Sequence, residues 1–194
     1  MSANKKKLAF TYNAPVTLTF ALLAFIALIL ANFTSGQSTS LVFSVYRSKI
    51  GVLWFVRLFG HVLGHSSLAH YTGNMTLFLL LGPVLEEKYG SKNLVEMISI
   101  VAVISGLVNI IFFPHVVLLG ASGIVFMMII LVSATDMRRG EIPITMILVI
   151  VIYLGTEIWN MVTVKDNISQ LTHIIGGICG AVFGYLYRAK GSRE

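Results

Sequence analysis

Four polar residues interrupt apolar segments of the sequence and together could carry acyl-transfer chemistry. They are Ser122, His173, His70 and Asn74. A serine hydroxyl becomes a nucleophile when a neighbouring base, such as a histidine, removes its proton. His70 and Asn74 are spaced i, i+4, so they project from one face of a helix, and both can donate a hydrogen bond to a developing oxyanion. A helical pair of this kind also fits a polar contact with a neighbouring helix.

Ser122 lies in a run of small residues, Gly120-Ala121-Ser122-Gly123, at the start of an apolar segment. This position places it near the amino end of a helix, where free backbone N–H groups and the helix dipole favour negative charge. An oxyanion that forms beside the serine would be stabilised there. The same run is typical of helix contacts in membranes, where small residues allow close packing. Taken alone, it therefore also fits a purely structural role.

His173 interrupts the last apolar segment, where an ionisable side chain is costly and tends to face the bundle interior or a water-filled cavity. Gly176, Gly180 and Gly184 follow at i+3, i+7 and i+11, so a glycine stripe lies on the face that carries the imidazole. Such a stripe lets another backbone approach closely. If the helix that begins near Ser122 packs there, the serine hydroxyl and the imidazole come within hydrogen-bond reach.

His61 and His65 offer a different interpretation, a metal site, because His-x3-His places two imidazoles on one helical face and His70 follows them. No Asp or Glu stands near them within the apolar segment, and the His-Glu-x-x-His motif of zinc proteases is absent. We therefore expect no metal and no other cofactor. We expect His61 and His65 to tie the segment that precedes the second span to that span by hydrogen bonds.

The elements that would position these residues are apolar helices. Hydrophobic residues make up 56% of the 194 positions and charged residues only 11%, compared with roughly one quarter charged in a soluble domain. Six segments of about 18 to 21 residues are each long enough to cross a hydrocarbon core. The composition predicts an all-α polytopic membrane protein with a single domain over residues 1–194. The expected spans are about 15–33, 66–85, 93–113, 117–135, 142–161 and 169–187.

The connection between the first two spans, residues 34–65, is too aromatic and too basic for a plain soluble loop. Trp and Tyr favour the headgroup level, and basic side chains can snorkel from a partly buried backbone. We expect this segment to lie in the membrane interface as short amphipathic pieces.

The net charge of +6 does not indicate nucleic-acid binding, because the basic residues stand at span ends rather than on one face. Ten lie on one side of the expected membrane and four on the other, which places both termini in the cytoplasm. The ten are Lys5, Lys6, Lys7, Lys88, Lys92, Arg138, Arg139, Arg188, Lys190 and Arg193, and the four are Arg47, Lys49, Arg57 and Lys165. We expect a multi-pass protein of a bacterial inner membrane.

This topology places the four polar residues at one depth. The second, fourth and sixth spans all run inward from the outer face, so His70 and Asn74 lie in the first turns of one span, Ser122 opens another, and His173 lies near the start of the last. The common depth predicts a single site. No acidic residue lies at that depth, so a Ser-His dyad is available and a Ser-His-Asp triad is not.

Three motifs in this order resemble the rhomboid family of intramembrane serine proteases: His61-x3-His65-x4-His70-x3-Asn74, Gly120-Ala121-Ser122-Gly123, and His173-x2-Gly176-x3-Gly180. The resemblance implies a six-helix rhomboid fold with Ser122 as nucleophile and His173 as general base. It implies that His70, Asn74 and the backbone N–H of Ser122 stabilise the oxyanion. Similar proteins lie in the lipid bilayer and cut transmembrane protein substrates near the outer membrane face, with the fifth helix as the expected gate.

The chain departs from the family pattern in two loops. Arg57 lies four residues before His61, as the pattern asks, but Val56 stands where Trp is expected. The Glu-x-Arg of the inner loop is replaced by Glu86-Glu87-Lys88, and lysine cannot reproduce the bidentate fork of arginine. We expect Arg57 and Glu86 to support the local loop architecture.

Two alternatives to a protease remain at the level of the sequence. One is a non-catalytic protein of the rhomboid fold that binds transmembrane helices, in which Ser122 would be chemically inert. The presence of both Ser122 and His173 favours catalysis over this alternative. The other, less favoured, is a small metal or solute transporter that uses His61, His65 and His70.

Overall fold

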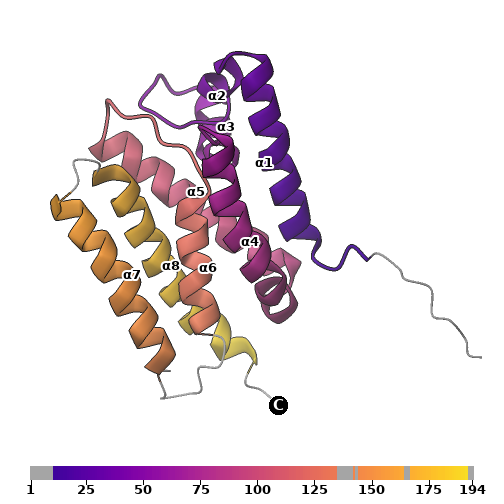
Figure 1. The fold of residues 1–194 in the computed structure, drawn as a ribbon, viewed down its shortest axis with the longest axis vertical. Helices are drawn as coiled ribbons and strands as arrows, with labels where there is room; N and C mark the ends of the chain where they lie inside the picture. Colours follow the sequence, from indigo (N-terminus) through magenta and orange to yellow (C-terminus); the bar gives the residue numbers. More distant parts are fainter. Residues whose placement is uncertain (1–10, 135–141, 143, 164–166, 192–194) are drawn as a thin grey trace, which may run out of the picture.

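The computed structural model describes residues 11–134, 142, 144–163 and 167–191. Across these residues the regular structure is helical, apart from one isolated antiparallel bridge between Val45 and Leu118. The all-α membrane bundle expected from the composition is confirmed. Five long helices and the shorter α6 form it among the described residues (Figure 1): α1 (Pro15–Phe33), α4 (Leu68–Tyr89), α5 (Ser91–Phe112), α6 (Ser122–Ser133), α7 (Ile144–Thr163) and α8 (Asn167–Gly191).

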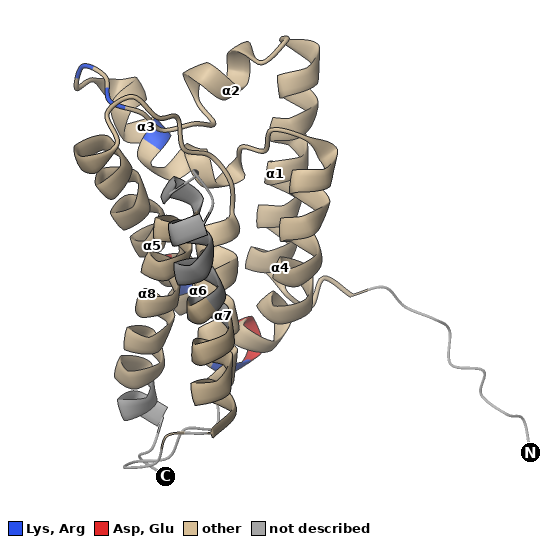
Figure 2. Cartoon of the chain, turned by 60° about the vertical axis from the view of Figure 1, so that its left-hand side comes forward, with Lys and Arg blue, Asp and Glu red and all other residues tan. Residues whose placement is uncertain are grey.

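The outer surface of the bundle suits hydrocarbon rather than water. Helices α1, α4 and α5 are each long and apolar enough to cross a membrane. Large apolar side chains such as Leu22, Phe25 and Leu80 are exposed on the outside of the bundle, where a water-soluble protein would carry polar groups. Figure 2 shows that Lys, Arg, Asp and Glu occupy only small parts of the described ribbon.

Helix α6 is the central element and packs against α4, α5, α7 and α8. It is apolar on all sides, and its buried residues include Ile124, Met127, Met128 and Leu131. A helix with this composition is stable only when neighbours surround it. Its twelve residues begin at Ser122, later than the apolar segment that starts near residue 117, because the preceding residues form an extended connection.

Glu86 fixes the beginning of α1 from the last turn of α4. Its carboxylate accepts hydrogen bonds from the backbone N–H groups of Val16 and Thr17, at 2.9 and 3.0 Å, and from the Thr17 hydroxyl at 2.9 Å. Ser91 donates to the same carboxylate at 2.7 Å. A negative group at the first N–H groups of a helix replaces the missing side-chain cap and complements the helix dipole. Glu86 therefore joins three helices, α1, α4 and α5.

The connection between α1 and α4 contains three short helices, α2 (Gln37–Leu41), α3 (Val52–Gly60) and the 3-10 turn η1 (His61–Leu63). Arg57 of α3 organises it. The guanidinium donates to the Leu41 carbonyl at 3.0 Å and the Ser48 hydroxyl at 3.2 Å, and it lies 4.4 Å from the centre of the Tyr46 ring. These contacts join Arg57 of α3 to the end of α2 and to the segment between α2 and α3.

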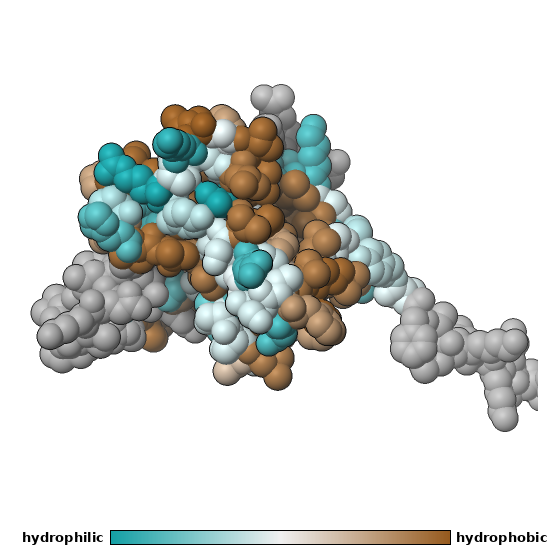
Figure 3. Space-filling model, turned by 90° about the horizontal axis from the view of Figure 1, so that it is seen from above, coloured by the Kyte–Doolittle hydropathy of each residue, from teal (hydrophilic) through white to brown (hydrophobic). Residues whose placement is uncertain are grey.

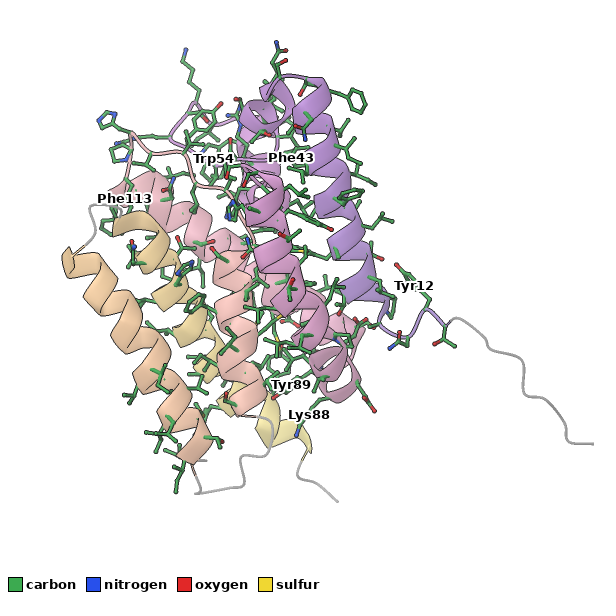
Figure 4. The ribbon with its side chains drawn as sticks, in the orientation of Figure 1. Tyr12, Phe43, Trp54, Lys88, Tyr89 and Phe113 are labelled. Atoms are coloured by element: carbon green, nitrogen blue, oxygen red, sulfur yellow. The ribbon has the colours of Figure 1, made fainter. Side chains whose placement is uncertain are left out.

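Apolar and hydrophilic residues lie side by side on this end of the molecule (Figure 3). Val52, Phe55 and Phe59 of α3 are exposed, as expected for a segment that rests in a membrane interface. Figure 4 places Phe43 and Trp54 at this end and Lys88 and Tyr89 near the opposite one.

The orientation of the bundle in the membrane, with both termini in the cytoplasm, remains a prediction. Of the basic residues that define the expected orientation, Lys5, Lys6, Lys7, Arg138, Arg139, Lys165 and Arg193 lie outside the described residues, as do the side chains of Arg188 and Lys190.

Candidate active site

Helices α4, α6 and α8 all begin at the end of the bundle where α1 finishes (Figure 1), which we call the site end. His70 is in the first turn of α4 and Asn74 one turn later. Ser122 is the first residue of α6, and His173 lies in the second turn of α8. The structure therefore brings all four sequence-predicted residues to the same end of the molecule.

The start of α4 fixes the His70 ring. Ser67 caps the helix, because its hydroxyl accepts a hydrogen bond from the His70 backbone N–H at 3.1 Å. The Ser66 hydroxyl lies 3.2 Å from Nδ1 of the His70 ring, and the His65 ring packs edge-on at 5.0 Å. When Ser66 donates to Nδ1, the proton of a neutral His70 resides on Nε2. That nitrogen is then a donor.

Gly120 lies directly against the two expected oxyanion donors. Its φ of +120° favours glycine. A methyl group at this position would lie 2.9 Å from Nε2 of His70 and 3.9 Å from Nδ2 of Asn74. Nδ2 of Asn74 is buried and finds no acceptor among the described residues. A buried donor without an acceptor is costly, and it suits a site where the acceptor forms only during the reaction.

Ser122 adds backbone donors to this site. The residue at the cap of α6, Ala121, contributes no side-chain hydrogen bond to the helix. The first N–H groups of α6, including that of Ser122, therefore have no intrahelical acceptor, and the helix dipole adds positive potential there. A negative oxygen beside Ser122 would find these groups already oriented.

Glycines allow α6 and α8 to touch through their backbones. A methyl group at Gly176 would overlap the carbonyl of Gly123, and one at Gly180 would overlap the carbonyl of Met127. A methyl group at Gly123 would lie 2.9 Å from Cγ2 of Thr172. Any side chain at these positions would push the two helices apart. The glycines thus set a close contact between the first turns of α6, which begins at Ser122, and the part of α8 that carries His173.

The His173 ring stacks on Phe126 of α6, with the ring centres 4.1 Å apart and the planes 6° from parallel. Phe126 lies one helical turn beyond Ser122, on the same face, so the stack holds the imidazole beside that face. Phe126 was not identified from the sequence, although its i+4 spacing from Ser122 was the available signal.

His61 supports the site through partners that the sequence did not predict. Its ring is 1% exposed; Nδ1 donates to the Arg57 carbonyl at 3.1 Å, and Nε2 lies 3.3 Å from the hydroxyl of Ser105 on α5. The His61 carbonyl accepts a hydrogen bond from the N–H of Gly120 at 2.9 Å. We expected His61 to form a hydrogen bond with the second span. Its hydrogen-bond partners instead lie on α3, on α5 and at Gly120, because η1 packs between these segments. Burial lowers the pKa of His61 to about 4.

His65 does contact the second span, through its ring rather than by a hydrogen bond. It packs edge-on against His70 at 5.0 Å and Tyr71 at 5.5 Å. Its Nδ1 donates to the nearby carbonyl of Leu63 at 3.1 Å. Burial lowers the pKa of His65 to about 4, so the ring is neutral at physiological pH.

Residues 53–190 match the family model of the Rhomboid domain. This range contains η1, the whole of α4, α5, α6 and α7, most of α8, and each of the four candidate site residues. Members of this family are usually intramembrane serine proteases that act on transmembrane substrates in the bilayer. The match covers well over half of the chain, and the apolar helices agree with it. The protein is therefore a multi-pass membrane protein that belongs to the rhomboid family.

Proposed function

We propose that the protein is an intramembrane serine endopeptidase that cuts transmembrane substrates near the outer membrane face by a Ser122-His173 dyad. One observation carries this proposal: the starts of α4, α6 and α8 meet around Gly120 and Gly123, two positions with no room for a side chain. In the proposed site, this meeting gathers the Ser122 hydroxyl, the His173 imidazole and the two side-chain donors His70 and Asn74. Helix packing alone would not require these four residue types together.

The chemistry follows from the roles of the groups. His173 accepts the proton of the Ser122 hydroxyl while the oxygen attacks the carbonyl carbon of the substrate peptide bond. The carbonyl oxygen becomes an oxyanion, which accepts hydrogen bonds from Nε2 of His70, Nδ2 of Asn74 and the N–H of Ser122. Protonated His173 then gives its proton to the leaving amine. A water molecule, deprotonated by His173, hydrolyses the acyl-serine and restores the hydroxyl.

The expected topology completes the proposal. With both termini in the cytoplasm, the site end of the bundle faces the outside of a bacterial inner membrane, from which water can reach the site. Helix α7 packs on α6 and α8 and is the expected gate through which a substrate helix would enter. We expect the reaction to need no cofactor.

The test is covalent labelling with a fluorescent fluorophosphonate, which reacts only with an activated serine. The full-length protein in liposomes would be compared with Ser122→Ala and with Ser133→Ala, a matched serine at the far end of the same helix. We expect label on the wild type and on Ser133→Ala, and none on Ser122→Ala. Absence of label on the folded wild type in liposomes would overturn the proposal and favour a non-catalytic helix-binding protein.

A further inference from the structure

The connection from α5 to α6, residues 113–121, leads directly to Ser122 and passes over the site end (Figure 1). It pairs with the segment that precedes α3: Val45 donates its N–H to the Leu118 carbonyl at 2.8 Å, and Leu118 donates back to the Val45 carbonyl at 2.9 Å. Two residues later, Gly120 donates to the His61 carbonyl. The register of this connection therefore decides where Gly120 lies.

The Asn109 side chain forms hydrogen bonds with both of the paired segments. It is in the last turn of α5 and is 2% exposed. Its Nδ2 donates to the Val45 carbonyl at 3.2 Å and to the Val116 carbonyl at 3.0 Å. Both hydrogens of the amide are thus used, one on each side of the pairing. The reverse orientation would set Oδ1 against two carbonyl oxygens, so the chemistry fixes the amide as observed.

The orientation of this amide has a cost. Oδ1 of Asn109 is buried and has no hydrogen-bond partner among the described residues. An unsatisfied buried acceptor destabilises a fold. An apolar residue of similar size would avoid that cost but would leave the Val116 carbonyl without this donor. The two hydrogen bonds to the Val45 and Val116 carbonyls therefore explain the amide better than helix packing does.

We propose that Asn109 is a positioning residue that sets the oxyanion site by holding residues 113–121 in register with Val45. This proposal rests on the proposed protease function. The space around Gly120 is tight, because a methyl group added there would lie only 2.9 Å from Nε2 of His70. A small displacement of the connection would therefore move Gly120, and with it the N–H of Ser122, relative to His70 and Asn74. A displacement of about 1 Å can lower a reaction rate by about 10²-fold.

The experiment measures saturation kinetics of fluorophosphonate labelling in liposomes, which separates the maximal labelling rate, kinact, from the half-saturating concentration, KI. Asn109→Leu removes both donors, and Asn109→Asp keeps the shape of the side chain but not its two N–H groups. For both, we expect kinact to fall about 10²-fold with KI unchanged. Asn109→Gln, which keeps both N–H groups, should recover part of the loss. Asn93→Leu, at the opposite end of α5, should label as the wild type does.

A double-mutant cycle distinguishes positioning from general destabilisation. If Asn109 acts by placing Gly120 against His70, the kinact of Asn109→Leu with His70→Ala should be little lower than that of either single variant. Independent effects would multiply instead. Multiplied losses, or a wild-type kinact in folded Asn109→Leu and Asn109→Asp, would overturn the inference while leaving the protease proposal intact. Failure of both variants to fold would also overturn it, because the amide would then be needed for the fold itself.

Discussion

At the scale of single residues, the site combines groups that are held before any substrate arrives. The His70 ring is held by the Ser66 hydroxyl and its backbone N–H by the Ser67 cap, and the His173 ring stacks on Phe126. Nδ2 of Asn74 is buried without an acceptor among the described residues. Donors that need no reorganisation at the moment of reaction stabilise an oxyanion most effectively. These contacts support the proposed role of His70 and Asn74 as oxyanion donors.

Removal of one oxyanion donor should slow the reaction without abolishing it. We expect Asn74→Ala and His70→Ala each to lower the maximal rate of fluorophosphonate labelling by roughly 10²- to 10³-fold, because the other donors remain. Thr72→Ala, an exposed position on the same helix, serves as the control. Labelling of Asn74→Ala at the wild-type rate would show that this amide does not face the oxyanion.

The buried histidines should make stability depend on pH. Burial lowers the pKa of His61 from 6.5 to about 4, so between these values the unfolded chain binds the proton and the folded chain does not. The contribution of His61 to the free energy of unfolding is then fully present above pH 6.5. It decreases as the pH falls, by up to about 3 kcal/mol near pH 4. We expect the Tm in micelles to fall between pH 6.5 and pH 5, and His61→Gln to reduce that fall.

His115, which is exposed, provides the matched control for this measurement. His115→Gln should keep the wild-type dependence of Tm on pH. A wild-type Tm that stays constant from pH 6.5 to pH 5, or an equal fall in His61→Gln, would contradict a buried neutral imidazole at position 61.

At the scale of helices, the proposed dyad depends on the close contact between α6 and α8. Gly176 and Gly180 lie against carbonyl groups of α6, so the distance between these helices is set by the absence of side chains. The start of α1 depends in a comparable way on one distant group, the Glu86 carboxylate. Both contacts join residues that are many positions apart in the sequence.

A side chain at Gly176 should separate the dyad. Gly176→Val would place methyl groups where the Gly123 carbonyl lies, so we expect a Tm lower by several degrees and labelling of Ser122 that is lost or reduced at least about 10²-fold. Gly155→Val, on α7, is the control, because a methyl group there would meet nothing within 4 Å. A folded Gly176→Val protein with wild-type labelling would argue against close packing at this point.

Sequence patterns predicted the helical bundle and the family, because apolar length and the spacing of His, Ser and Gly are local features. They placed Ser122 near the amino end of its helix, but the expected span began at residue 117, before the observed start of α6 at Ser122. Residues 117–121 are mostly apolar, so their sequence predicts a helix. In the structure they are extended because Leu118 pairs with Val45, more than seventy positions earlier. Asn109 and Phe126 escaped prediction for the same reason, since each acts on a segment that folding brings near.

At the scale of the whole molecule, the membrane protein belongs to the rhomboid family, and its lipid-facing helices surround a short central helix that carries the serine. The three helices that supply the site all begin at one end of the bundle (Figure 1). The polar residues His70, Asn74, Ser122 and His173 lie in the first turns of these helices, while the described ribbon carries few charges (Figure 2). This arrangement allows polar chemistry at one end of an otherwise apolar molecule.

The rate of fluorophosphonate labelling in His173→Ala shows whether His173 activates Ser122. A general base contributes roughly 10²- to 10⁴-fold to such a reaction. We therefore predict a labelling rate at least about 10²-fold below that of the wild type, with the Tm little changed and with His115→Ala labelled at the wild-type rate. A folded His173→Ala protein that labels on Ser122 as fast as the wild type would contradict the dyad.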